Sequence, residues 1–412
     1  MFEAAAVCLV VTALLAYLNV RFIGLPTAIG TMAASLALSL ALVALDPSGL
    51  ARSVRQYEES LLRSIDFSNV LMQGMLSMLL FAGALHVDLQ QLKIHRWPVA
   101  VLAVLGTTLS TLAVGFGMWA ALPLLGLNLP LIHCLLFGAL ISPTDPIAVM
   151  GILKSARAPK ELELVIAGES LFNDGVGVVI FALLLDMLAS GIAPTANEAL
   201  RLLLREAGGG VLYGLVLGYV TFRLLKSVDN YEVEVMLTLA AVTGGYLLAS
   251  KLHVSGPLAM VVVGLMVGNQ GRALAMSDTT RRYLDMFWEL LDQILNAVLF
   301  VLMGMEVLLV TFGVGELAAT ALAVAVTLLA RALIVGLPAA ALPRVFNLPR
   351  GSWKVLTWAG LRGGISVALA LSMPAGAERD TVVALTYGVV VFSIFVQGLS
   401  IGRVARRSVA GR

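Results

Sequence analysis

Thirteen apolar stretches follow one another along this chain of 412 residues, and nearly all of them are long enough to cross a bilayer. A helix needs about 20 apolar residues to span a hydrocarbon core of about 30 Å. Only 13% of the residues are charged, against roughly a quarter in a typical soluble domain. The composition therefore excludes an ordinary soluble protein and predicts an all-α polytopic membrane protein. The predicted helices cover residues 2–19, 24–45, 67–85, 98–125, 130–153, 162–188, 208–225, 233–250, 254–269, 286–310, 316–342, 352–374 and 381–402.

The distribution of Lys and Arg orients these helices. If the N-terminus lies outside and the C-terminus in the cytoplasm, 18 basic residues fall in inner loops and 7 in outer loops. Such an excess on the inner side is typical of membrane proteins, and omitting one helix would invert every later loop. Only Arg331 and Arg362 then remain within helices. We therefore expect a multi-pass protein of the cell membrane with its N-terminus outside and its C-terminus cytoplasmic.

The helix count suggests two related halves. Six helices lie in about 1–190 and six in about 230–403, and a linker helix at about 208–225 separates them. Because the halves are offset by an odd number of helices, the second half would have inverted topology, as in many secondary transporters. We expect a single transmembrane transporter domain over 1–412, with no separate soluble domain.

Two helices in corresponding positions of the halves are interrupted. The fifth contains the sequence SPTDP at 142–146, whose prolines cannot continue a helix, and the twelfth contains GLRGG at 360–364. Irregular backbone is tolerated within a membrane where it is buried or lines a cavity. Paired interruptions indicate a binding site near the middle of the membrane. We therefore expect helices 5 and 12 to be discontinuous and to cross there.

Five ionisable residues lie well within the predicted helices: Asp145, Glu169, Asp174, Arg331 and Arg362. Such residues are costly in a bilayer and are usually functional. Three carboxylates against two guanidiniums leave one negative charge, which one monovalent cation or one proton would neutralise. The count favours electroneutral one-for-one exchange, provided that the five groups are buried together.

The cation or proton is expected to bind at Asp174, which follows Asn173 in the sequence GESLFNDG at 168–175. Hard cations such as Na⁺ prefer oxygen ligands, and Thr144 and Ser170 could supply them from side chain or backbone. A Ser within a membrane helix is also a common packing residue. Both readings of Ser170 therefore stay open.

The other intramembrane charges are expected to support this site. Glu169 is predicted to form an ion pair with Arg331 that ties two helices together. Asp145, at the break in helix 5, is expected among the residues of the cation and proton site, and it could also offset the positive N-terminal dipole of a half-helix. Arg362 could likewise lie by exposed carbonyls at a half-helix C-terminus.

A polar stripe occupies the inner end of the tenth helix. It consists of Asp285, Glu289, Asp292 and Asn296, at spacings of four, three and four. The stripe either lines a cytoplasmic funnel that attracts cations or forms the hydrated end of an amphipathic helix, and the sequence slightly favours the second. The role of Glu306 is left open.

These features closely resemble the monovalent cation:proton antiporters (CPA1), in the branch of the NhaP-type antiporters and the Na⁺/H⁺ exchangers. The resemblance spans the fifth to the twelfth helix in the family's order, and the hydropathy profile fits over essentially the whole chain. The matching pieces are SPTDP at 142–146, GESLFNDG at 168–175, LFVLMGME at 299–306, RAL at 331–333 and GLRGG at 360–364.

The resemblance implies a thirteen-helix inverted-repeat fold, a homodimer and alternating access by a moving core bundle. It makes Asp174 the carboxylate that binds Na⁺ and H⁺ in turn, with Asn173 beside it. The Asn–Asp pair is similar to that of the electroneutral branch. Thr144 and Ser170 would complete the cation shell, and the remaining charged residues would have the roles set out above.

The same residues bear on other functions. A K⁺/H⁺ antiporter on this fold stays open, because ligand types alone do not separate Na⁺ or Li⁺ from K⁺. A cation channel would need a repeated filter segment or a ring of identical charges, and the sequence contains neither. An enzyme is not expected, since no catalytic motif occurs. We expect monovalent cations, protons and the lipid bilayer as partners, a homodimer, no nucleic acid and no cofactor.

Overall fold

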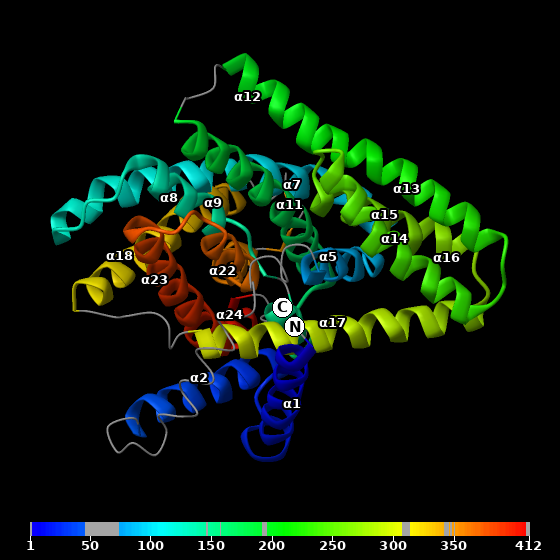
Figure 1. Ribbon diagram of the computed structural model, residues 1–412, viewed down its shortest axis with the longest axis horizontal. Coiled ribbons are helices and arrows are strands. Elements are labelled where there is room, and N and C mark those ends of the chain that lie inside the picture. The colour runs from blue at the N-terminus through cyan, green and yellow to red at the C-terminus, as the bar shows by residue number, and fades with distance from the viewer. Residues whose placement is uncertain are drawn as a thin grey trace.

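The computed structural model describes residues 2–45, 74–145, 147–156, 158–191, 196–306, 314–341, 346, 348–349 and 351–408. All regular secondary structure in these ranges is helical, as the sequence predicts (Figure 1). Within these ranges, eight helical segments are long and apolar enough to span a membrane, and three shorter apolar helices accompany them. The eight are Ala5–Ile23, Arg96–Leu125, Lys160–Ser190, Leu204–Lys226, Tyr231–Lys251, Asp278–Met305, Leu317–Ala341 and Ala377–Ser408.

Each apolar stretch predicted from the sequence contains helix in its described part, although two of the stretches are interrupted. In chain order these helices are first α1 (Phe2–Leu18), α2 (Thr27–Leu45), α5 (Leu76–Leu85), α7 (Arg96–Ala100), α8 (Thr107–Ala121), α9 (Leu131–Ile141), α10 (Ile147–Ser155), α11 (Lys160–Ser190) and α13 (Gly209–Lys226). They are followed by α14 (Tyr231–Lys251), α15 (Gly256–Met266), α17 (Asp278–Glu306), α18 (Val314–Arg331), α19 (Leu337–Ala341), α21 (Ser352–Trp358), α22 (Gly364–Leu371), α23 (Ala377–Phe392) and α24 (Leu399–Ser408).

Several boundaries differ from the predicted ones. α17 begins at Asp278, eight residues before the predicted start. An apolar stretch does not include its first two turns, because they are amphipathic. Among the described residues, three short helices lie outside the predicted stretches, in connections: α6 (Leu89–Ile94), α12 (Ala196–Leu203) and α16 (Arg272–Leu274). The predicted residues 67–73, 146, 307–310 and 342 lie outside the described ranges.

The helix α17 joins two parts of the hydrophobic core. Figure 1 shows it running along much of the molecule, with α1 and α2 packed beside it. Trp288, in its N-terminal half, is fully buried in a cluster with residues of α5, α14 and α15. Phe300, in its C-terminal half, is fully buried in a second cluster built mainly from α2, α9, α22 and α23. One helix therefore contacts both helix groups.

Small residues allow α13 and α15 to approach closely. Gly210, Gly214 and Gly218 are spaced by four along one face of α13. A Cβ atom at Gly214 would come within 2.9 Å of the Val262 side chain on α15. Stripes of this kind are typical of helix contacts in membranes, where close packing replaces the hydrophobic effect as the source of association.

Both interruptions occur where the sequence places them. Helix α9 ends at Ile141 and α10 begins at Ile147, while α21 ends at Trp358 and α22 begins at Gly364. The connecting segments are non-helical where described, and Ser142, Thr144, Leu361 and Arg362 are all buried. Buried non-helical backbone must find hydrogen-bond partners, and those partners define the candidate site.

Candidate functional site

The two helix interruptions are hydrogen-bonded to each other. The backbone N–H of Asp145 donates to the carbonyl oxygen of Leu361 at 2.8 Å. Arg362 Nη1 donates to the carbonyl oxygens of Ser142, at 2.6 Å, and Pro143, at 2.7 Å. These carbonyls lie at the C-terminal end of α9, where a helix dipole favours a cation. The buried guanidinium thus fixes the segment that carries Thr144 and Asp145.

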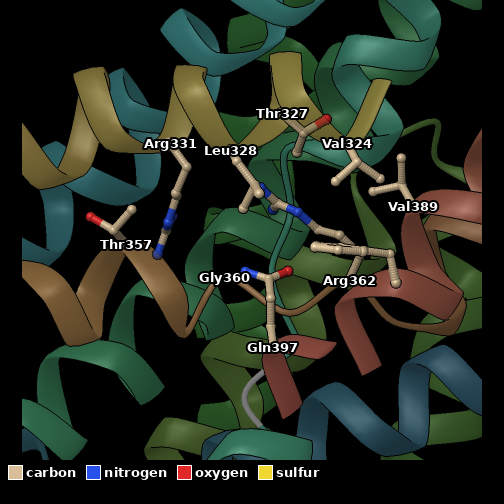
Figure 2. Close-up of a pocket in the computed structure, with 10 residues that line it drawn as sticks. Val324, Thr327, Leu328, Arg331, Thr357, Gly360, Arg362, Val389 and Gln397 are labelled. Atoms are coloured by element: carbon tan, nitrogen blue, oxygen red, sulfur yellow. The ribbon is translucent and has the colours of Figure 1, made fainter. Parts of the chain in front are cut away.

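Glu169 and Arg331 form a buried ion pair between α11 and α18. Arg331 Nη1 donates to Glu169 Oε1, and Arg331 Nη2 donates to Oε2 at 3.0 Å. Arg331 also donates from Nε and Nη2 to the carbonyl of Leu356, at 3.3 and 3.2 Å. Figure 2 shows Arg331 extending from α18 towards α21, which carries Thr357. Both carboxylate oxygens of Glu169 therefore have partners.

Thr144 is held by two side chains of α11. Asn173 Nδ2 donates to Thr144 Oγ1 at 2.9 Å, and the backbone N–H of Thr144 donates to Asn173 Oδ1 at 3.3 Å. The hydroxyls of Thr144 and Ser170 lie 2.9 Å apart and share a hydrogen bond. All three residues are buried. Asn173 and Ser170 thus hold Thr144 in position through hydrogen bonds from α11.

Asp174 lies on the wall of a large cavity. Its side chain is 6% exposed, and it borders, together with Thr144 and Asp145, a cavity of about 680 Å³. Within the described residues no salt bridge involves Asp174, in contrast to Glu169. Asn173, Ser170 and Glu169 are not among the residues that line the cavity.

The cavity extends from Asp174 towards residues that the sequence assigns to the inner ends of helices. Its polar lining includes His86 and Gln91 near α5 and α6, Lys160 and Glu163 at the start of α11, and Glu289, Asp292 and Asn296 on α17. Three members of the predicted polar stripe therefore face the cavity.

The fourth member of the stripe lies elsewhere. Asp285 forms an ion pair with Arg272, and neither residue lines the cavity. Glu289, Asp292 and Asn296 therefore fit the hypothesis of a cation-attracting funnel, which the sequence slightly disfavours. Asp285 fits the alternative hypothesis, the hydrated end of an amphipathic helix. The side chain of Glu306 lies outside the described part of the structure.

Two residues that the sequence pattern does not single out support the interruption in helix 12. Ser393 Oγ accepts from the backbone N–H of Arg362 at 3.1 Å, and Gln397 Nε2 donates to the carbonyl of Trp358 at 3.1 Å. Both belong to the π-helical segment η10 (Ser393–Gly398). The available signal was a Ser and a Gln four residues apart in an otherwise apolar helix.

Comparison with known proteins gives a consistent family. A family model described as "Sodium/hydrogen exchanger, transmembrane" matches residues 10–407. The chain is 52% identical to the Na⁺/H⁺ antiporter NhaP of Pseudomonas aeruginosa over 417 residues, covering 100% of this chain and 98% of that protein. It is 34% identical to the Na⁺/H⁺ antiporter NhaH of Halobacillus dabanensis over 353 residues, covering 84% and 85%.

Solved structures share the fold. The structure of the sodium proton antiporter MjNhaP1 from Methanocaldococcus jannaschii at pH 8 matches with a TM-score of 0.78 at 20% sequence identity. The match covers 100% of this chain and 99% of that one. The helix arrangement in Figure 1 is therefore that of a solved polytopic membrane protein.

Proposed function

We propose that Na⁺ and H⁺ compete for Asp174 in this chain, which belongs to the sodium/hydrogen exchanger family. Members of this family are transporters and not enzymes, and the chain is a Na⁺/H⁺ antiporter. The observation that carries the proposal is the contrast between two buried carboxylates on α11. Both oxygens of Glu169 are bonded to Arg331, whereas Asp174 borders a cavity of about 680 Å³. Asp174 is the one that a solvated cation can reach.

The surrounding residues support a Na⁺ site. Carboxylate, hydroxyl and carbonyl oxygens are the ligands that hard cations prefer. Thr144 borders the same cavity as Asp174, and Asn173 and Ser170 hold Thr144 in place. Asp145 also lines the cavity and adds negative charge there. We assign Asp174 and Thr144 to direct contact with the ion, and Ser170 and Asn173 to positioning.

The charge count supports electroneutral exchange of one Na⁺ for one H⁺. Arg331 neutralises Glu169, and Arg362 neutralises one more of the three carboxylates. A proton or a Na⁺ at Asp174 removes the last charge. A bare carboxylate leaves the buried cluster charged, which is costly in a low-dielectric medium. Reorientation is therefore expected only with an ion bound, so leak is suppressed.

The wider architecture that we propose follows from the same segments. Thirteen membrane helices form two inverted repeats, about 1–190 and 230–403, joined by a linker helix at about 208–225, and the two crossed interruptions alternate in access between the two sides. The inner residues that line the cavity support an inward-facing opening. A homodimer and a cytoplasmic C-terminus are part of the proposal.

The decisive experiment is dissipation of a pH gradient in proteoliposomes on addition of Na⁺, Li⁺ or K⁺, with and without a clamped membrane potential. We expect Na⁺ to support exchange at a rate that the potential does not change. Asp174→Asn should abolish exchange while the protein still folds, and Asp285→Asn, which lies outside the cavity, is the matched control. Normal exchange by Asp174→Asn would refute the assignment, and acceleration by a potential would refute electroneutrality.

A further inference from the structure

A second, small cavity borders Arg362. It measures about 10 Å³ and is bordered by α18, by the interruption between α21 and α22, and by α23 with η10 (Figure 2). Arg331 and Arg362 both line it, but none of the residues that line the larger cavity do. The residues that surround it are Val324, Thr327, Leu328, Arg331, Thr357, Gly360, Arg362, Val389, Phe392 and Gln397.

Two of the side chains around this cavity carry a buried polar atom without a hydrogen-bond partner in the described part of the chain. These atoms are Thr327 Oγ1 and Arg362 Nε. Thr327 is 5% exposed and Arg362 is 3% exposed. Arg362 Nη1 is already bonded to Ser142 and Pro143, so its Nε–H needs a separate acceptor. Buried polar groups almost always have partners, because leaving one unpaired costs about 1–3 kcal/mol.

The size of the cavity selects the ligand. A single water molecule needs roughly 10–15 Å³ of accessible space and two to four polar partners. The cavity offers that volume, and the two side chains that border it and carry an unpaired buried polar atom supply an N–H donor and a hydroxyl that can both donate and accept. The two guanidiniums do not require a bound anion, since Glu169 neutralises Arg331 and backbone carbonyls of helix 5 accept hydrogen bonds from Arg362.

We propose that this cavity binds one water molecule, which bridges Thr327 to Arg362 and makes Thr327 a positioning residue for the guanidinium. The water accepts from Arg362 Nε and shares a hydrogen bond with the Thr327 hydroxyl. Arg362 is then held on both sides, by α18 through the water and by the Ser142 and Pro143 carbonyls directly. Because those carbonyls immediately precede Thr144, the water acts on the cation site at a distance.

The first test is a high-resolution crystal structure or cryo-EM map of the wild-type protein. We expect one solvent peak within hydrogen-bonding distance of Thr327 Oγ1 and Arg362 Nε. A well-ordered map without solvent density there would overturn the proposal. An anomalous peak after a bromide soak would also overturn it, because it would mark an anion site. This test needs no transport, so its result is independent of the role proposed for Asp174.

The second test compares Na⁺-dependent antiport by three variants in proteoliposomes and rests on the proposed function. Thr327→Val keeps the shape but removes the hydroxyl, and it should raise the KM for Na⁺ about fivefold, as the loss of one buried hydrogen bond would, with Vmax nearly unchanged. Thr327→Ser should restore the wild-type KM. Thr320→Val is the control, because Thr320 Oγ1 is also buried without a described partner on α18 but does not line the cavity.

The variants separate positioning from general packing. If folded Thr327→Val has the wild-type KM, or if Thr320→Val raises the KM equally, Thr327 has no positioning role. Should Thr327→Val not fold, Thr327→Ser and the wild-type map still decide the question. If the wild-type protein shows no Na⁺ exchange, the proposed function is refuted. The water site is then tested by the wild-type map alone.

Discussion

Glu169 on α11 is bonded through both carboxylate oxygens to Arg331 on α18. The two residues are 162 positions apart in the chain and almost fully buried, at 1% and 6% side-chain exposure. An Arg side chain presents its donors in a planar fork that matches a carboxylate. The pair therefore fixes the relative position of the two helices while leaving no net charge.

Breaking this pair should destabilise the protein strongly. Glu169→Gln leaves Arg331 charged and without its partner in a buried position, a change that costs about 3–5 kcal/mol. We expect a large fall in the apparent Tm of the detergent-solubilised protein. Replacing both residues with Met should lower the Tm less than Glu169→Gln does, since no lone charge remains. An unchanged Tm in Glu169→Gln would contradict the structural role, and Asp285→Asn, in a partly exposed pair, is the control.

Asn173 should affect Na⁺ affinity through Thr144. Asn173→Ala removes the amide that donates to Thr144 Oγ1 and accepts from its backbone N–H. Losing these buried bonds costs about 1–3 kcal/mol, which should raise the KM for Na⁺ by about tenfold.

Asn19 provides a matched control for this effect. It is equally buried and, like Asn173, donates from Nδ2 and accepts at Oδ1, but both of its partners are backbone atoms of Leu25, outside the cavity. Asn19→Ala should lower the Tm without changing the KM. Equal KM changes in the two variants would show that Asn173 acts only through stability.

Gly363 lies against Asp145 where the two interruptions meet. A Cβ atom there would lie 2.9 Å from the Cβ of Asp145, closer than real Cβ contacts allow. Gly363→Ala should therefore displace the Asp145 segment and abolish most exchange activity in proteoliposomes. Gly151→Ala in α10 is the control, because nothing lies within 4 Å of its added Cβ and Ala favours helix. Full activity in Gly363→Ala would show that the crossing tolerates separation.

The features that the sequence predicts well are local ones. The prolines at 142–146 and the glycines at 360–364 interrupt helices whatever they pack against, because Pro lacks a backbone donor and Gly weakens a helix. Long apolar stretches likewise report membrane helices directly. The start of α17 is harder to predict, since its first turns are amphipathic and carry charges that a hydropathy window excludes.

The features that the sequence does not predict are non-local ones. The bond from Asp145 N–H to Leu361, and the support of Arg362 by Ser393, join segments far apart in the chain. Which side of α17 faces water was also open, because a polar stripe has the same spacing whether it lines a cavity or the outer surface. Only the packing of α17 against α5 and α22 places Asp292 on the cavity wall and Asp285 outside it.

Asp292 should attract cations into the cavity without binding them at the transport site. It shares the cavity with Asp145 and Asp174 but lies on a different helix. Two unit charges about 10 Å apart interact by about 1 kcal/mol in a partly hydrated site, so Asp292→Asn should raise the KM for Na⁺ about threefold, with little change in Vmax. Screening shortens the range of this attraction to about 10 Å at 0.1 M salt, so the effect should shrink as choline chloride is added.

The effect of Asp292→Asn should appear when Na⁺ is presented to the cavity side of the membrane and not when Na⁺ is presented to the opposite side. If the cavity side is cytoplasmic, inside-out membrane vesicles present Na⁺ to it. Asp285→Asn, seven residues earlier on α17 and outside the cavity, should leave the KM unchanged. An effect of Asp292→Asn that persisted at high ionic strength would instead indicate direct contact with the transported ion.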